Sequence, residues 1–306
     1  MKQGSRILIA GCGYVGCATA QRLHKDGHSV FGIRRNLDQL PEGIQPVAID
    51  LLSDDYTLLP PKLDAVVWSL SPTRDPEGYR QAYIEAPRRL LEFLRLRGDT
   101  LQRAVLVGST SVWSGSHGEF VDEDTPPNPA NYRGQSILAG ESVFNACPFH
   151  SVNLRVAGIY GPQRAHMLTK IREGTATTPS KQIFTNRVWR DDIANAIRHV
   201  LQLSDPQPVY TVVDDEPADL REVYEWLANR LGIKLPAAVD SYAGRGDLVG
   251  GLPRSRGRCA SASGEDERQR AEGEGAQPDG RHLGLHQGRP ARHGSRGRAE
   301  TQRDRP

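Results

Sequence analysis

A glycine-rich turn near the N-terminus constrains the fold more than any other feature of this sequence. The apolar stretch Ile7–Ala10 runs directly into Gly11, Gly13 and Gly16, and a run with helical spacing follows. In a strand–turn–helix unit, the first glycine permits the tight turn, the second allows a pyrophosphate to approach the backbone, and the third lets helix and strand pack closely. The sequence therefore predicts a phosphate-binding turn at the first strand of a parallel sheet. The alternative is a plain strand–helix turn.

Up to about residue 245, short β-branched apolar runs alternate with helical patterns. This alternation predicts an α/β fold, a doubly wound parallel (Rossmann) sheet covered by helices on both faces. The expected strands are Arg6–Ala10, Ser29–Ile33, Gln45–Ile49, Ala65–Trp68, Ala104–Val107, Ser151–Arg155 and Val209–Val213. The expected helices are Val15–Asp26, Tyr79–Arg97, Gly134–Ala146, Asp191–Leu203 and Leu220–Leu231. We expect no regular structure in Gly161–Lys181.

The composition changes near the C-terminal end. Residues 251–306 contain twelve Arg, no Lys and ten Gly, and their large apolar residues are three leucines. So little apolar surface cannot offset the chain entropy that folding removes. We expect a nucleotide-binding domain at 1–160 and an interleaved substrate-binding region at 161–245, which includes the helix at 191–203. The tail at 246–306 is expected to be disordered, or non-native because of a frameshift in the gene.

Charge, cysteines and hydropathy exclude several classes of protein. The net charge of +2 at pH 7 gives no general reason to expect a nucleic acid or a membrane as partner. The four cysteines form no CxxC pair and the histidines lack zinc-ligand spacing, so we expect free thiols, a reducing cytoplasmic location and no metal. The first twenty residues resemble a signal peptide, but their regularly spaced glycines favour the strand and helix instead.

The residues after the second strand bear on which dinucleotide would bind. An NAD site usually carries an acid about twenty residues beyond the glycines, whereas here Arg34 and Arg35 follow Ser29–Ile33. Two guanidinium groups suit a 2′-phosphate, so we expect NADP, with NAD as the alternative. Asp50 is either a neighbour of the adenine or a loop-capping residue. The further expected cofactor contacts are Gly11, Gly13, Tyr14, Val15, Gly16 and Ser69.

Hydroxyl side chains follow the strand Ala104–Val107 in the piece GSTSVW at 108–113, at the edge where such sheets bind ligands. Further pieces are ILIAGCGYVG at 7–16, LRVAGIYGP at 154–162, NRVWRDDIANAI at 186–197 and VYTVVDDEP at 209–217. With these pieces the chain resembles the extended short-chain dehydrogenase/reductases, in the NAD-dependent epimerase/dehydratase family, and most closely its atypical YeeZ-type members. The resemblance covers about residues 5–236.

The resemblance implies a catalytic site made of a Ser or Thr, a Tyr, and a Lys one helical turn after the Tyr. In such a site the Tyr hydroxyl exchanges a proton with the substrate while hydride moves to or from the nicotinamide. The Lys is needed because a Tyr with a pKa of about 10 is mostly protonated near neutral pH. Ser109 matches the Ser/Thr position.

The Tyr and Lys positions do not match cleanly. Counting from Tyr132, the Lys position falls on Ser136. If the helix is aligned on its glycine and glutamate instead, Arg133 takes the Tyr position and Ile137 the Lys position. The Lys is missing in both alignments. Tyr132 is a candidate catalytic residue or a helix-entry aromatic packed on the loop, and Arg133 holds a substrate anion or is simply exposed.

The remaining polar candidates would contact substrate. Ser111 and Trp113 extend from the Ser109 strand end toward substrate, and Arg133 would hold an anion. By resemblance, Tyr160 and Arg187 lie near substrate too, and Arg155 lies near the nicotinamide as a further cofactor contact. A buried Trp113 and a structural Arg187 are the alternatives, and Asp191 or Asp192 is expected to cap the helix that follows. The resemblance implies an NAD(P)-dependent oxidoreductase or epimerase/dehydratase acting on a small polar carbonyl or hydroxyl compound, such as a nucleotide sugar, and a homodimer. The alternative is a catalytically inactive NADP(H)-binding sensor or regulatory protein.

Overall fold

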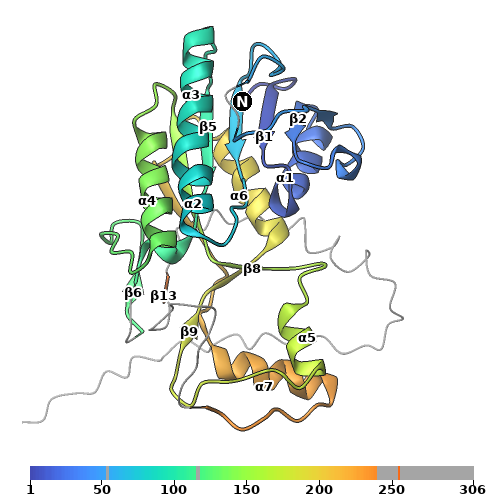
Figure 1. Ribbon diagram of the computed structural model, residues 1–306, viewed down its shortest axis with the longest axis vertical. Helices are drawn as coiled ribbons and strands as arrows, with labels where there is room; N and C mark the ends of the chain where they lie inside the picture. Colours follow the sequence, from blue (N-terminus) through green and yellow to red (C-terminus); the bar gives the residue numbers. More distant parts are fainter. Residues whose placement is uncertain (53–54, 115–117, 240–253, 256–306) are drawn as a thin grey trace, which may run out of the picture. The chain divides into compact units, whose positions relative to one another are not determined.

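The centre of the molecule is a seven-stranded parallel sheet with the strand order β11-β7-β5-β4-β1-β2-β3 (Figure 1). It is seen in a computed structural model that describes residues 1–52, 55–114, 118–239 and 254–255. Its strands are β1 (Arg6–Ala10), β2 (Ser29–Ile33), β3 (Gln45–Pro46), β4 (Ala65–Trp68), β5 (Arg103–Val107), β7 (Ser151–Val156) and β11 (Val209–Val212). The predicted α/β fold class is confirmed.

Helices lie on both faces of this sheet (Figure 1). The described helices are α1 (Tyr14–Lys25), α2 (Pro76–Arg80), α3 (Ala86–Arg97), α4 (Tyr132–Asn145), α5 (His166–Arg172), α6 (Arg190–Gln202) and α7 (Leu220–Leu231). Three short helical turns are η1 (Leu37–Gln39), η2 (Gln81–Glu85), which is a π-turn, and η3 (Thr110–Val112).

Alternate residues of the central strands supply two separate apolar clusters. Leu8 and Ala10 of β1 pack with residues of α3 and α4, whereas Ile7 and Ile9 pack with residues of α1 and α6. This follows from the two-residue period of a strand, which sends successive side chains to opposite faces. All four residues are fully buried, as the continuous apolar sequence of a central parallel strand requires.

The helix predicted at Tyr79–Arg97 is longer and less regular than expected. It begins at Pro76 because Asp75 accepts a hydrogen bond from the backbone nitrogen of Gly78 at 2.8 Å. The π-turn η2 then separates α2 from α3. Helix α4 packs closely on this turn, since a Cβ on Gly140 would lie 2.7 Å from the carbonyl oxygen of Tyr83.

Two other predicted boundaries are wrong. The third strand ends at Pro46 rather than Ile49, because the chain then leaves the sheet. Helix α5 lies inside Gly161–Lys181, where no regular structure was expected. Its Ile171 forms a small apolar cluster with Ala176 and with Tyr224 and Ala228 of α7, apart from the two clusters of the sheet.

Short paired strands were not predicted from the sequence. These are β8 (Gly158–Tyr160) with β10 (Arg187–Trp189), β9 (Phe184–Thr185) with β12 (Ala218–Asp219), and β6 (Phe120–Val121) with β13 (Arg254–Ser255). Strand β13 falls in the tail at 246–306, which was expected to have no structure. The other residues of this tail lie outside the described residues.

The described residues up to 239 belong to one compact unit. The predicted domain boundaries at 160 and 245 stay predictions. In the part of the chain that the structure describes, no helix is long and apolar enough to cross a bilayer.

Candidate functional site

The glycine turn joins β1 to α1 as predicted, and two of its glycines are required by the protein's own packing. Gly11 has φ +92°, and a Cβ there would lie 2.6 Å from the backbone nitrogen of Leu70. A Cβ on Gly16 would lie 2.6 Å from the carbonyl oxygen of Gly11. A Cβ atom does not approach another non-bonded heavy atom this closely, so these two glycines let helix, turn and neighbouring strand pack together.

Gly13 has a different role. A Cβ on Gly13 would meet no other atom closer than the carbonyl oxygen of Gly11 at 4.0 Å. Gly13 is also the N-cap of α1, with no side-chain hydrogen bond at the cap and no acid in the first turn. Unpaired N–H groups and the helix dipole make such an end suitable for phosphate. The space beside Gly13 and the uncapped helix end both fit a pyrophosphate.

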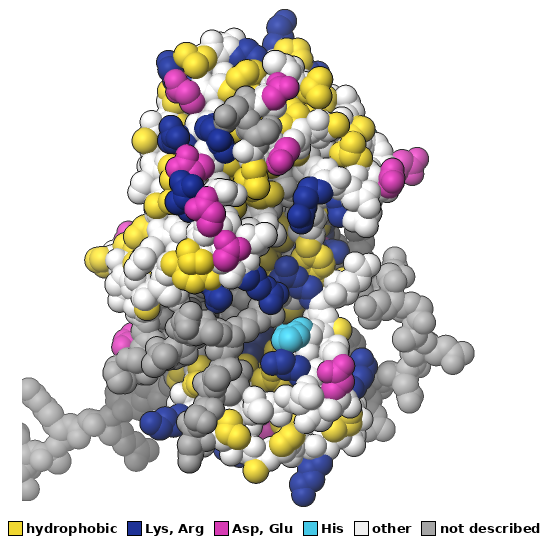
Figure 2. All heavy atoms as spheres, viewed as in Figure 1, with side chains coloured by type: hydrophobic (Ala, Val, Ile, Leu, Met, Phe, Trp, Pro, Cys, Tyr) yellow, Lys and Arg dark blue, Asp and Glu magenta, His cyan; other side chains and the backbone are white. Residues whose placement is uncertain are grey.

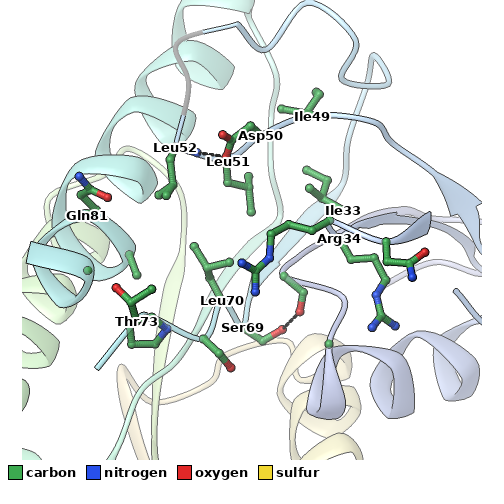
Figure 3. A pocket seen from close by; sticks show the side chains of 18 of the residues that line it. Ile33, Arg34, Ile49, Asp50, Leu51, Leu52, Ser69, Leu70, Thr73 and Gln81 are labelled. Atoms are coloured by element: carbon green, nitrogen blue, oxygen red, sulfur yellow. Dashed lines mark hydrogen bonds between the residues drawn. The ribbon is translucent and has the colours of Figure 1, made fainter. Parts of the chain in front are cut away.

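A pocket of about 890 Å³ opens beside this turn (Figure 3). The predicted cofactor residues that line it are Gly11, Gly13, Arg34, Arg35, Asp50 and Ser69, and apolar walls come from Ile33, Ile49, Leu51 and Leu70. Apolar walls with a few polar groups suit a planar base and its ribose. Tyr14, Val15, Gly16 and Arg155 are not among the lining residues, and Val15 belongs to the buried core.

Two polar residues of the pocket are held by local hydrogen bonds. The Ser69 hydroxyl donates to the carbonyl oxygen of Gly11 at 2.9 Å, and an Asp50 carboxylate oxygen accepts from the backbone nitrogen of Leu52 at 2.9 Å (Figure 3). Asp50 therefore caps a loop and lines the pocket at once. It does not end the third strand, which was the expected position.

Arg34 is anchored beside the glycine turn. Its guanidinium donates to the backbone oxygen of Gln39 at 2.9 Å, to the side-chain oxygen of Gln39, and to the sulfur of Cys17 at 3.5 Å. Arg35 lines the same pocket. No acid follows directly after β2, and the pocket lining combines the two arginines with the carboxylate of Asp50.

Tyr14 connects the turn to a distant segment. Its hydroxyl donates to the carbonyl oxygen of Pro162 at 2.7 Å, and the guanidinium carbons of Arg164 and Arg190 lie 4.6 and 5.1 Å from its ring centre. Burial raises the pKa of the Tyr14 hydroxyl.

Figure 2 shows Lys and Arg side chains gathered in the middle of the face that it displays. Their positive charge would attract an anionic ligand.

A second group of polar residues lies where β5 meets α4. The Ser109 hydroxyl accepts a hydrogen bond from the backbone nitrogen of Ser111 at 3.2 Å and so begins η3. Helix α4 starts against this turn, since a Cβ on Gly134 would lie 2.1 Å from the carbonyl oxygen of Ser111. The close contact brings the Ser109 turn and the first residues of α4 together, as the family resemblance implied.

The first turn of α4 places Tyr132 and Arg133 side by side. Asn131 caps the helix by accepting from the backbone nitrogen of Arg133 at 3.0 Å. The Tyr132 hydroxyl donates to the carbonyl oxygen of Arg74 at 3.2 Å and accepts from the Arg133 guanidinium at 3.2 Å. Tyr79 packs edge-on against the Tyr132 ring at 5.5 Å between centres.

The family model described as NAD dependent epimerase/dehydratase matches residues 7–213, about two thirds of the chain. The chain belongs to the NAD-dependent epimerase/dehydratase family. A provisionally assigned NAD-dependent epimerase/dehydratase from Methylobacillus flagellatus is 32% identical, with a TM-score of 0.65 over 83% of this chain and 88% of that one. The YeeZ-type subgroup stays a prediction.

Two further structures extend this comparison. A protein of unknown function from Silicibacter pomeroyi is 25% identical, with a TM-score of 0.67 over 83% of this chain and 89% of that one. The Bordetella bronchiseptica enzyme WbmG, solved with NAD and UDP, has a TM-score of 0.69 at 17% identity over 82% of this chain and 86% of its own, which shows the shared fold. None of the curated proteins compared with the chain matches it significantly.

Neither of the two candidate Lys positions on α4 holds a cation. Ile137 is 3% exposed and packs in the apolar cluster with Phe144. Ser136 is partly exposed and is followed by no nearby cation in α4. Among the side chains of this helix turn, the cation next to the Tyr132 hydroxyl is Arg133.

Trp113 and Arg155 are buried rather than open to a ligand. Trp113 is 2% exposed and donates through Nε1 to the carbonyl oxygen of Thr125 at 2.9 Å. Arg155 is 4% exposed, bonds both oxygens of Glu141 at 2.9 and 2.8 Å, and lies 4.5 Å over the Trp113 ring. Both residues thus serve the fold, and the substrate and cofactor contacts predicted for them find no support in these positions.

Arg187 and Tyr160 lie on the paired strands β10 and β8, with Asp214 beside them. Tyr160 donates to the Asp214 carboxylate and stacks edge-on against Trp189 at 5.2 Å. Burial raises the pKa of Asp214 and lowers the pKa of Arg187. Asp214 was not among the residues predicted from the sequence. The sequence feature that could have indicated it is the pair Asp214–Asp215, which follows β11.

Asp191 does not cap α6. The N-cap is Trp189, without a side-chain cap bond, and Asp191 lies in the first turn. Its carboxylate pairs with Arg22 at 3.3 Å and Arg190 at 2.7 Å, which ties α6 to α1. In the described ranges up to residue 239, no group of three or more His, Cys, Asp or Glu side chains forms a metal-binding cluster.

Proposed function

We propose that the protein binds NADP(H) at the glycine turn and acts as an oxidoreductase or epimerase/dehydratase on a small polar carbonyl or hydroxyl compound. The observation that carries the cofactor half is Gly13, which lines the pocket at an uncapped helix end where the protein's own packing does not require a glycine. The bound cofactor would supply or accept hydride at its nicotinamide ring. A cytoplasmic location and a homodimer belong to this proposal.

Arg34 and Arg35 support NADP over NAD. They line the pocket directly after β2, where an NAD site usually holds an acid for the ribose hydroxyls. A planar guanidinium forms paired hydrogen bonds with phosphate. Several structural relatives hold NAD, among them MoeE5 with UDP-glucuronic acid, so both dinucleotides belong in the binding test.

The chemistry is proposed for Ser109 and Tyr132. The Ser109 hydroxyl would hydrogen-bond the reacting oxygen, and the Tyr132 hydroxyl would exchange a proton with it. Arg133 donates to the Tyr132 hydroxyl and brings a positive charge to that oxygen, where other members of the family would use a Lys. Ser111, Tyr160 and Arg187 would contact the substrate, for which a nucleotide sugar is the proposed class.

A dinucleotide-binding sensor without turnover is the second candidate. The observation in its favour concerns Ile137, which occupies one of the two candidate Lys positions. Ile137 is a buried apolar residue and supplies no positive charge to a catalytic Tyr. A sensor would bind NADP(H) in the same pocket but would not use the Ser109 hydroxyl.

Titration and turnover separate the two candidates. Quenching of NADPH and NADH fluorescence on adding the full-length protein measures binding, which both candidates require. Oxidation of NADPH with aldehydes, ketones and 4-keto sugar nucleotides, and epimerisation of UDP-sugars, then measure turnover. Turnover with any of these supports the enzyme, and saturable binding without turnover supports the sensor. Failure to bind either dinucleotide would falsify both.

A further inference from the structure

Two cysteines meet inside the glycine turn. Cys12 lies between Gly11 and Gly13, and Cys17 follows in the second turn of α1, where its backbone nitrogen donates to the carbonyl oxygen of Gly13 at 2.8 Å. This local path brings their sulfur atoms to 3.8 Å from each other. The mechanism proposed above uses neither thiol.

The two sulfurs have unlike surroundings. Cys12 is fully buried, and its sulfur would lie 3.2 Å from a Cβ on Gly32 of β2. Cys17 is partly exposed, and its sulfur lies 3.5 Å from the Arg34 guanidinium. In this arrangement Cys17 is the cysteine open to an external reagent, and the sulfur of the buried Cys12 lies next to it.

The same surroundings shift the pKa values of the two thiols in opposite directions. The sulfur–sulfur hydrogen bond with Cys12 lowers the pKa of Cys17 to about 7 against the effect of burial, and the charges of Arg34 and Arg190 act in the same direction as the bond. The hydrogen bond to Cys17 and burial raise the pKa of Cys12. Because the thiolate is the nucleophilic form, Cys17 is the attacking sulfur of the pair.

We propose that Cys12 and Cys17 form a redox-active dithiol that exchanges with small-molecule disulfides such as oxidised glutathione. The Cys17 thiolate attacks one sulfur of the external disulfide, so a mixed disulfide forms and one thiolate leaves. The first thiolate that has left takes the proton of the Cys12 thiol, and the Cys12 sulfur attacks the Cys17 sulfur. The Cys12–Cys17 bond then forms, the bond between Cys17 and the external sulfur breaks, and the second thiolate leaves. The cysteine pair loses two electrons and two protons, and the external disulfide becomes two thiols.

Oxidation of this pair would alter the dinucleotide site, a step that rests on the proposed function. A disulfide requires the sulfurs to close from 3.8 Å to about 2.05 Å. The turn that must move is held by the close contacts of Gly11 and Gly16. Oxidation also removes the thiolate that faces Arg34, an anchor of the pocket wall. We therefore expect the disulfide and the bound dinucleotide to oppose each other.

The test uses the full-length protein in glutathione redox buffers of increasing oxidised fraction. Trypsin cleavage after Arg6 and Arg22 leaves both cysteines in one peptide, residues 7–22. After the free thiols have been alkylated, we expect this peptide to lose two hydrogens in mass and to carry no alkyl group. Cys147, whose thiol pKa is raised by burial, is the internal control and should remain alkylated at the same ratios.

Variants identify the order of attack. In Cys12→Ala, Cys17 should accumulate as the stable mixed disulfide with glutathione. In Cys17→Ser, Cys12 should stay unmodified in the folded protein. The wild-type measurement stands by itself if the buried Cys12→Ala change impairs folding. A peptide 7–22 that stays doubly alkylated at every ratio, or Cys17 alkylated no faster than Cys147 at pH 7, would overturn the proposal.

The cofactor arm repeats the redox titration with saturating NADP⁺. We expect half-oxidation to need a more oxidised buffer, and the oxidised protein to bind NADP⁺ more weakly by the same equilibrium factor. If the disulfide forms but NADP⁺ binds and leaves the midpoint unchanged, the coupling is wrong. If NADP⁺ does not bind at all, the proposed function fails while the mass measurement still decides on the dithiol.

Discussion

Tyr132 is the residue on which the proposed chemistry depends. Its hydroxyl accepts from Arg133 at 3.2 Å and donates to the carbonyl oxygen of Arg74 at 3.2 Å. Two hydrogen bonds hold the oxygen in place, as a positioned acid or base requires. The bond to Arg74 also fits the alternative role of a helix-entry aromatic packed on the loop, so variants of Tyr132 separate the two roles.

We expect Tyr132→Phe to reduce turnover by about 100-fold or more, the usual contribution of a positioned acid or base. NADPH affinity should stay within about twofold, because the ring is kept and Tyr132 does not line the pocket. Tyr79→Phe is the matched control, since Tyr79 packs on the same ring, and should keep most of the activity. Equal losses in both variants would assign the effect to packing.

Arg35 carries the prediction on dinucleotide choice. We expect Arg35→Ala to weaken NADPH binding about 10- to 100-fold, since a charged hydrogen bond contributes about 1.5–3 kcal/mol, while NADH binding changes little. Arg95→Ala is the control, because Arg95 is an exposed arginine of α3 paired only with Glu92 in the described contacts. Fluorescence titration with both dinucleotides measures the ratio. A parallel loss for NADH would show that Arg35 does not read the 2′-phosphate.

The glycine turn assigns different work to glycines only a few residues apart. Gly11 and Gly16 are fixed by backbone atoms at 2.6 Å, whereas Gly13 faces open space. We expect Gly13→Ala to fold with nearly unchanged Tm but to lose about tenfold or more in NADPH affinity, because the methyl group enters the space kept for phosphate. Gly16→Ala should instead lower Tm by several degrees, since overpacking costs about 1–3 kcal/mol. Normal binding by Gly13→Ala would remove the main support for the pocket's ligand.

The contact between α4 and β7 contains a buried ion pair. Arg155 and Glu141 are joined at 2.8 Å with side chains 5% exposed. Removing one partner leaves a buried charge, so we expect Glu141→Gln to lower the free energy of unfolding by about 3–5 kcal/mol. The exposed pair Arg95–Glu92 offers the control, and Glu92→Gln should cost less than about 1 kcal/mol. Urea unfolding measures both, and equal small effects would contradict the structural role of Arg155.

At the scale of the whole molecule, ligand binding should appear as stability. If NADP(H) binds the folded chain only, a concentration of 100 times Kd adds about 2.7 kcal/mol to the free energy of unfolding. We therefore expect NADP⁺ to raise Tm by several degrees and NAD⁺ at the same concentration to raise it less. Thermal unfolding followed by circular dichroism measures this. An equal rise in Tm with NADP⁺ and NAD⁺ would still support a dinucleotide site but would contradict the preference for NADP.

The central part of the sheet was predictable because its residues follow a single rule. β1, β2 and β4 begin and end where the apolar runs do, since they are buried on both faces. β3 was not predictable, because it is an edge strand that the chain leaves after Pro46 to line the pocket. Helix α5 was missed since its one buried residue, Ile171, gives no period to read.

The part of the candidate site formed by the backbone of the glycine turn was predictable from the sequence. The side-chain contacts formed between distant segments were less predictable. Gly11 and Gly16 were placed correctly in the strand–helix turn because their spacing reflects local packing. For Trp113 the sequence left a buried position open as an alternative, and for Arg155 it gave no partner. Only tertiary structure shows that Glu141 pairs with the arginine and that the indole is covered. Asp214 and its contact with Tyr160 depend on strands far apart in the sequence, which no local pattern reveals.

The bond from Tyr14 to Pro162 gives the molecule a mechanical linkage. The phenol stands at the first position of α1, while the carbonyl that it holds lies 148 residues further on, next to Gly161, where a Cβ would lie 2.8 Å from the Tyr14 hydroxyl. The bond joins the helix end beside the glycine turn to the segment that precedes α5. We therefore expect changes at Gly161 or Pro162 to alter the residence time of a bound dinucleotide, although neither residue lines the pocket.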